Sequence, residues 1–236
     1  MDSADAVERI DGDPSSRVVF TCEHASAELP EPWTWPDEDR WLVGTHWASD
    51  LGAAGFTRRV ARLMNAPAVL SRFSRLLIDP NRPLDSDTLF RENADGKTVH
   101  LNERLLEAER RRRIDRFYLP YHAAVSAMVT RSKGDIVFAI HTFTDNYEGQ
   151  RRALEVGVLF DHDEALALQL VDRLKRSGFH AAPNEPWSGK AGLAYSPVRH
   201  ARELGRSALE IEARQDLIVD EAFAAPLAEA LLGFFT

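Results

Sequence analysis

Short apolar runs rich in β-branched residues alternate along this chain with longer segments of helical periodicity. This alternation is typical of a mostly parallel sheet flanked by helices, because parallel strands need crossover connections and are buried on both faces. We therefore expect an α/β fold. The expected strands cover residues 18–22, 68–71, 75–79, 135–140, 156–160 and 207–211, and the expected helices cover residues 51–64, 102–129 with an interruption near Pro120, 164–176 and 220–235.

The length of 236 residues is enough for one substantial domain with its own core. Residues 1–16 are polar and acidic, so we expect a disordered leader there and a single domain over residues 17–236. The leader lacks the basic start and apolar core of a signal peptide, and no apolar run approaches the roughly 20 residues of a membrane span. Cys22 is the single cysteine, which excludes an intrachain disulfide and fits a reducing compartment. We expect a cytoplasmic protein without a membrane partner.

The formal net charge of the chain is -8. Because nucleic-acid binding relies on basic surfaces, this charge argues against nucleic acid as a partner. The same charge means that an anionic substrate would need cationic side chains concentrated at the binding site.

Two histidines stand at the ends of expected strands. His24 comes soon after residues 18–22, and His141 directly follows residues 135–140. In open parallel sheets, ligands bind beyond the carboxyl ends of the strands. Two histidines and a carboxylate are a usual ligand set for catalytic zinc, which keeps its fourth position for water. The sequence therefore predicts a zinc site at this edge of the sheet, although a lone strand-end histidine is more often structural.

The third metal ligand is either Asp50 or Glu28. Asp50 directly precedes an expected helix, a position where aspartate also serves as an N-cap. Glu28 lies four residues after His24 and would share its face only if that segment were helical. Pro30 and Pro32 make a long helix there unfavourable, so we prefer Asp50 and keep Glu28 as the alternative.

Glu210, Glu212 and Arg214 alternate along the last expected strand and would share one of its faces. One interpretation is an edge strand with a solvated charged face. The functional interpretation makes Glu212, or Glu210, the general base beside the metal, with Arg214 holding a substrate carboxylate. Asn81 and Arg82 follow the third expected strand, where they either form a turn and a surface ion pair or bind substrate.

Six segments of the chain together resemble the N-formylglutamate amidohydrolase family. They are TCEHAS at residues 21–26, SRLLIDPNRP at 74–83, PYH at 120–122, AIHTFT at 139–144, NEPWS at 184–188 and EIEARQDL at 210–217. They occur in the family's order over nearly the whole chain. The resemblance implies an amidohydrolase-like catalytic domain with a fold similar to zinc carboxypeptidases (phosphorylase/hydrolase-like). It also implies metal-dependent hydrolysis of the amide of an N-acyl amino acid such as N-formylglutamate.

The resemblance also implies roles for individual residues. His24 and His141 match the family's histidine positions, and Asp50 matches an aspartate before a helix. Arg75 resembles the group that stabilises the oxyanion in carboxypeptidase-like sites. The pair of Asn81 and Arg82 resembles the groups that bind a substrate carboxylate. The implied partner is therefore a small molecule that bears a carboxylate.

Three positions depart from the family pattern and bear on the substrate. Ala27 stands where asparagine is usual, Asp145 where proline is common and Trp187 where tyrosine is usual. Two alternatives stay open beside the N-acyl amino acid hydrolase. One is a peptide or cell-wall amide hydrolase that uses the same site, and the other is a non-catalytic small-molecule binding protein of the same fold.

Overall fold

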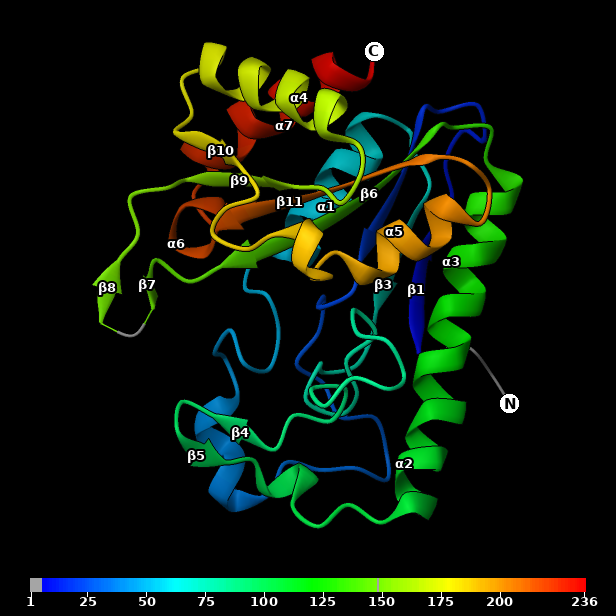
Figure 1. The fold of residues 1–236 in the computed structure, drawn as a ribbon, viewed down its shortest axis with the longest axis vertical. Coiled ribbons are helices and arrows are strands. Elements are labelled where there is room, and N and C mark those ends of the chain that lie inside the picture. The colour runs from blue at the N-terminus through cyan, green and yellow to red at the C-terminus, as the bar shows by residue number, and fades with distance from the viewer. Residues whose placement is uncertain (1–5, 148) are drawn as a thin grey trace.

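The computed structural model describes residues 6–147 and 149–236, and it is organised around one seven-stranded sheet (Figure 1). Four of the six strand pairings in this sheet are parallel, which confirms the expected mostly parallel sheet. In spatial order the strands are β1 (Val7–Ile10), β3 (Ala68–Ser71), β2 (Val18–Cys22), β6 (Ile136–Phe143), β11 (Ser207–Arg214), β9 (Val156–Leu159) and β10 (Ala181–Pro183).

Helices cover both faces of the sheet, as the alternating pattern predicts. One face packs against α1 (Ala53–Leu63), α4 (Glu164–Arg176) and α7 (Glu221–Phe235). The other face packs against α3 (Leu119–Arg131) and α5 (Tyr195–Arg202). The remaining short helices are η2 (Asp37–Leu42), η3 (His100–Asn102), α2 (Glu107–Arg113), η4 (Ile114–Tyr118), η5 (Gly189–Ala191) and α6 (Gln215–Ile218). None of the described helices combines the length and apolar character needed to cross a membrane.

The core on the first face is dominated by aromatic rings from distant parts of the chain. Phe20 of β2 and Phe138 of β6 meet edge to face at 6.0 Å between ring centroids. Phe235 of α7 meets the same two rings at 5.9 and 5.1 Å. Because burying one such side chain contributes about 1.5–3 kcal/mol, this cluster ties the carboxyl-terminal helix firmly to the central strands.

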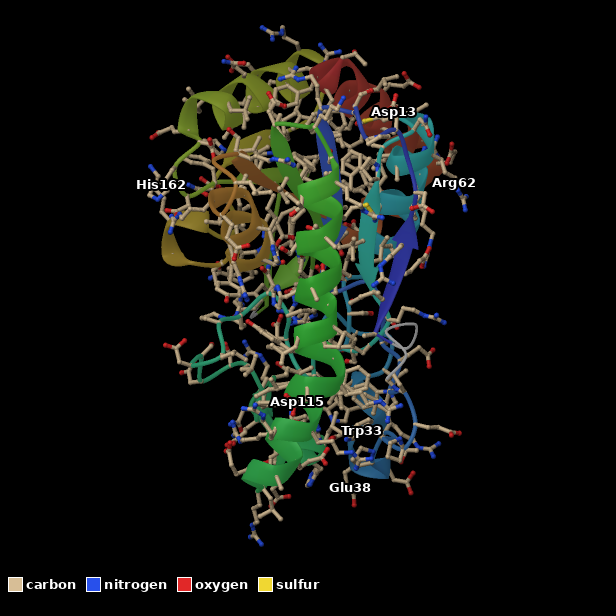
Figure 2. The ribbon with its side chains drawn as sticks, turned by 90° about the vertical axis from the view of Figure 1, so that its right-hand side faces the viewer. Asp13, Trp33, Glu38, Arg62, Asp115 and His162 are labelled. Atoms are coloured by element: carbon tan, nitrogen blue, oxygen red, sulfur yellow. The ribbon has the colours of Figure 1, made fainter. Side chains whose placement is uncertain are left out.

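The other side of the molecule is formed by a nearly continuous helical region, α2–η4–α3, which Figure 2 shows along its length with Asp115 near the lower end. The sequence predicts one helical region here with an interruption near Pro120. The interruption is a π-helical turn, η4, which ends two residues before Pro120. Proline lacks the N–H that would continue the regular ladder, so a wider turn next to it leaves fewer backbone groups unpaired.

The expectation of a disordered leader over residues 1–16 is wrong for the part that the structure describes. Val7–Ile10 forms β1, which pairs antiparallel with β3 along the edge of the sheet. Glu8 also accepts two hydrogen bonds from Arg58, at 2.8 and 2.6 Å. These tertiary contacts order a segment whose own pattern is weak. Residues 1–5 lie outside the described residues.

The expected strand at residues 75–79 is also wrong. The chain leaves β3 and turns there, with the Leu77 N–H donating to Ser74 O at 2.9 Å. Leu76, Leu77 and Ile78 are fully or almost fully buried, so the apolar run reflects packing rather than strand pairing. The turn directs the residues that follow it toward the carboxyl ends of the central strands. Two small hairpins, β4 (Asn93–Ala94) with β5 (Lys97–Thr98) and β7 (Asn146–Tyr147) with β8 (Gln150–Arg151), lie on the same side of the molecule (Figure 1).

Candidate active site

The expected strand-end residues meet at the carboxyl ends of the central strands. His24 lies two residues beyond β2, whereas His141 lies within β6, which runs three residues further than expected. Glu212 of β11 is in register with His141, so both side chains leave the same face of the sheet. This is the face covered by α3 and α5, and on it the apolar side chains give way to polar ones toward the strand ends.

His24, Asp50 and His141 form a buried group in which the possible ligand atoms lie within 4.8 Å of one another. Asp50 Oδ2 is 2.7 Å from His141 Nδ1 and 3.4 Å from His24 Nδ1. The Asp50 N–H donates to His24 O at 3.0 Å, which fixes the approach of the two segments. The structure therefore brings together the three residues that the sequence analysis assigns to the metal.

The structure supports neither the N-cap role of Asp50 nor the placement of Glu28 beside the histidines. Gly52, not Asp50, is the residue at the N-cap of α1. Glu28 lines a separate groove beside β1, together with Val7 and Arg58. Asp50 is the carboxylate that faces the two histidines.

Each histidine of this group uses its second ring nitrogen to contact another buried carboxylate. His24 Nε2 is 2.8 Å from Asp79 Oδ1, and His141 Nε2 is 3.0 Å from Glu23 Oε2. Glu23 is held in turn by the Tyr121 hydroxyl, which donates to Oε1 at 2.9 Å. A carboxylate behind a metal-binding histidine fixes its tautomer and makes the opposite nitrogen a better ligand. The arrangement leaves both Nδ1 atoms directed toward Asp50.

The charges around this group fit a divalent cation. Among the described residues around this group, five carboxylates lie at 7% exposure or less, and they are Glu23, Asp50, Asp79, Glu210 and Glu212. Among the described residues, Arg75 is the one arginine or lysine in ion-pair distance of any of them. Buried carboxylates in such excess are stable when they are paired or when they coordinate a metal. The residues present therefore fit zinc in both donor type and charge.

The pKa values of these groups reflect their close coupling. Burial alone would raise the pKa of Glu23, but hydrogen bonding and charge from His141 lower it to about 2. Burial likewise opposes ionisation of Asp50, yet the two histidines hold its pKa well below the ordinary value. Burial would lower the pKa of His141, but Glu210, Asp50 and Glu23 raise it well above the ordinary value. These interactions therefore favour the charged form of both Glu23 and Asp50.

Glu210 and Glu212 share the inner face of β11 but have different surroundings. Glu210 Oε2 accepts from Asn81 Nδ2 at 3.5 Å and lies 3.8 Å from His141 Nε2. Glu212 Oε2 is buried without a hydrogen-bond partner among the described residues. Burial raises the pKa of Glu210 to about 7 and that of Glu212 well above the ordinary value. The interpretation of β11 as a solvated edge strand is wrong, because the strand lies between β6 and β9.

Arg75 and Asn81 are largely engaged by the protein itself. Arg75 contacts Asp50 at 3.3 Å and Asp79 at 3.2 Å, so it steadies two of the carboxylates around the histidines. The Asn81 side chain donates to Leu193 O at 3.1 Å and accepts from the Ser196 N–H at 2.9 Å. Both residues line the cavity, but Asn81 mainly connects the turn after β3 to the start of α5.

Arg82 and Arg214 have different positions. Arg82 lines the cavity and donates to Thr88 Oγ1 and to its neighbour's carbonyl oxygen, Asn81 O, at 3.2 and 2.9 Å. Arg214 does not line the cavity, and its guanidinium is held by Asp216 at 2.8 and 3.3 Å. Arg214 Nη1 also donates to Arg152 O at 3.1 Å, which places it behind the cavity wall.

These residues surround a cavity of about 260 Å³. Its walls also contain residues that the sequence analysis does not assign to the site, namely His46, Trp47, Arg91, Phe143, Tyr147, Arg152 and Trp187. His46 Nε2 is buried without a hydrogen-bond partner among the described residues, and burial together with nearby Arg75 lowers the pKa of its ring. A neutral imidazole therefore faces the same space as Glu212.

Comparison with known proteins identifies the family. The family model for N-formylglutamate amidohydrolase matches residues 16–219. The chain belongs to this family. Membership makes the protein an amidohydrolase, as the six sequence segments predict. The comparison with curated proteins found no significant match to the chain.

Solved structures agree with this membership. The gene product Atu2144 from Agrobacterium tumefaciens is 30% identical with a TM-score of 0.90, over 99% of this chain and 94% of that one. An N-formylglutamate amidohydrolase from Ralstonia eutropha JMP134 is 21% identical with a TM-score of 0.73, over 98% and 96% of the two chains. At that identity the second likeness concerns the fold alone.

Some site residues of this member of the N-formylglutamate amidohydrolase family that the sequence analysis does not name could be found from the local sequence, whereas others could not. Glu23 and Asp79 stand in the same segments as His24 and Asn81, and His46 lies four residues before Asp50. Their closeness in sequence to candidate residues is the feature that could have identified them. Arg91 and Arg152 lie in loop and hairpin segments without a recognisable pattern. Only the folded chain brings them to the cavity.

Proposed function

We propose that this protein is a zinc-dependent amidohydrolase that cleaves the amide bond of an N-acyl amino acid such as N-formylglutamate. The observation that carries the proposal is the group of His24, Asp50 and His141 beside Glu212, whose buried carboxylate oxygen has no partner among the described residues. The reaction adds one water across the amide. N-formylglutamate would give formate and glutamate.

Each residue has a role that follows from its position. His24 and His141 would hold zinc through Nδ1, and Asp50 would hold it through a carboxylate oxygen. The metal supplies Lewis-acid chemistry, which polarises a carbonyl group and makes water more acidic. Glu212 takes a proton from the attacking water and delivers it to the departing amide nitrogen.

Two arginines complete the proposed assignment. Arg75 spends two contacts on Asp50 and Asp79, and a guanidinium has five N–H donors, so it retains donors for the oxygen that becomes negative. Arg82 lines the cavity without a carboxylate partner among the described residues, and it would bind a carboxylate of the substrate. These cations offset the acidity of the whole chain at the place where an anionic substrate binds.

The experiment that tests this function measures formate and free glutamate released from N-formyl-L-glutamate by the zinc-loaded protein. We expect equal amounts of the two products. Hydrolysis of peptide or cell-wall amides without formate release would favour the alternative hydrolase. Binding of N-formyl-L-glutamate without any turnover would favour the binding-protein alternative and overturn the proposal.

A further inference from the structure

The cavity has more arginines than the proposed reaction uses. Arg82, Arg91 and Arg152 all line it, and none of them has a carboxylate within ion-pair distance among the described residues. Arginine is always charged in proteins, so an unpaired guanidinium in a half-buried position loses hydration without a compensating partner. Cations left in this state inside a cavity indicate anionic groups on the molecule that binds there.

Of these three arginines, Arg152 contacts the largest number of aromatic rings. Its guanidinium carbon lies 4.7 Å from the ring centre of Tyr147, 4.8 Å from that of Trp187 and 5.6 Å from that of Phe143. Tyr147 and Trp187 themselves meet edge to face at 5.4 Å. Stacked rings occupy the faces of a guanidinium and leave the N–H groups at its edge available for a carboxylate. One of these groups donates to Thr144 O at 3.3 Å.

The backbone of Arg152 is fixed on both sides. Its N–H donates to Asp145 O at 2.7 Å, and its carbonyl oxygen accepts from Arg214 Nη1 at 3.1 Å. Arg214 is held in turn by the two carboxylate oxygens of Asp216. The side chain therefore extends from a fixed point of the backbone, directly after β8. A preorganised cation of this kind binds its partner with a smaller loss of conformational entropy.

The other two arginines have different surroundings. Arg91 contacts a single ring, with its guanidinium carbon 5.5 Å from the centre of Trp47. Arg82 spends donors on Thr88 and on Asn81 O, and the proposed function uses it for one substrate carboxylate. Arg152 comes from a different element and lies against a different set of side chains. It is thus placed for a second group on the same substrate.

We infer that Arg152 binds a second anionic group of the substrate and so selects N-acyl amino acids with an acidic side chain over those with a neutral one. This inference rests on the proposed function, in which Arg82 binds the other carboxylate. A site built around a buried charge discriminates strongly against an analogue that lacks the matching group, because the charge then stays unpaired. Arg152 is in this sense a specificity-determining residue.

The test compares N-formyl-L-glutamate with N-formyl-L-glutamine, which differs by one neutral amide in place of the side-chain carboxylate. In Arg152→Met we expect kcat/KM for the glutamate substrate to fall about 10- to 100-fold, the size of one charge-assisted contact. The glutamine substrate should change less than about twofold, since it makes no such contact. Arg152→Lys should fall between, because lysine keeps the charge but not the planar fork.

The matched control is Arg151→Met, at the neighbouring residue that ends β8 and is exposed and outside the cavity wall. It should leave both substrates unchanged, and unfolding temperature and zinc content should match wild type in all variants. Equal losses on both substrates, or no loss on either, would overturn the inference while the proposed function stands.

A calorimetric comparison of L-glutamate and L-glutamine binding separates the two proposals further. If the wild-type protein hydrolyses neither formyl substrate, the proposed function fails. Weaker binding of L-glutamate to Arg152→Met, with L-glutamine unaffected, would still support the inference in that case. Unchanged binding of both would overturn it.

Discussion

At the scale of single residues, Glu210 and Glu212 show how two similar side chains on one strand face come to differ. Glu210 is engaged with Asn81 and lies near the outer nitrogen of His141. Glu212 is directly opposite His141 in the register and keeps a free oxygen in the cavity. A general base needs an available oxygen within reach of the water it deprotonates. This difference assigns the base to Glu212 in the proposed mechanism.

The substitution Glu212→Gln tests this assignment. Glutamine keeps the shape but cannot accept the proton, so kcat should fall by about 10²- to 10⁴-fold while zinc content stays at the wild-type level. Glu210→Gln is the matched control and should cause a smaller loss, because its amide can still contact Asn81. Formate release and elemental analysis on the same samples provide the measurement. Full activity in Glu212→Gln would refute the role of Glu212 as base.

Residues of the candidate site are predictable from the sequence where their chemistry and their position at a strand end coincide. His24, Asp50 and His141 were found because histidines at strand ends and an aspartate before a helix are visible in one dimension. The contact partners of these residues were not found. Asp79 meets His24 across 55 residues of chain, and such a contact depends on a turn that the sequence presents as a strand.

At the scale of elements, strand β9 packs closely against the segment that precedes Trp187, a residue of the cavity wall. Gly157 of β9 is in register with Glu212 of β11. A Cβ atom added at Gly157 would lie 1.8 Å from Glu185 O and 3.4 Å from Glu212 Cβ. Backbone cannot yield by that amount without moving a strand or the neighbouring segment. Glycine is therefore required here for packing.

We predict that Gly157→Ala lowers the free energy of unfolding by about 1–3 kcal/mol, as overpacking usually does. It should also lower activity, because the displaced segment carries a wall of the cavity. The control is Gly55→Ala in α1, where an added Cβ meets nothing within 4 Å. Alanine there should raise the stability by up to about 1 kcal/mol through helix propensity. Denaturant unfolding of both variants is the measurement, and equal stabilities for the two would contradict this account.

Elements with a strong local pattern were predicted well, and those that depend on distant partners were not. The strand Ala68–Ser71 and the helix Glu164–Arg176 have the bounds expected from their periodicity and flanking residues. The sequence does not predict β1 and β10, because edge strands of three or four residues carry little pattern of their own. The helix Tyr195–Arg202 was also missed, since its short apolar face is interrupted by Pro197.

At the scale of the whole molecule, an acidic protein encloses a cavity with four arginines in its wall. The net charge of -8 does not indicate this local concentration of positive charge, because the arginines come together only when the chain folds. The segment between β3 and β4 brings Arg75, Arg82 and Arg91 to the cavity wall, and the residue directly after β8 brings Arg152. Strands β6 and β11 contribute His141, Glu210 and Glu212 to the same cavity. This combination of groups fits the proposed substrate, whose amide would meet the histidines and glutamates and whose anionic groups would meet the arginines.

The most direct test of the account combines zinc content with catalysis. The protein is stripped with a chelator and back-titrated with zinc, and N-formyl-L-glutamate hydrolysis is measured on each sample beside elemental analysis. We predict that activity rises in proportion to bound zinc and reaches its maximum at about one zinc per chain, with His141→Ala binding little zinc and showing little activity. Full hydrolytic activity in the metal-free wild-type protein would contradict the account.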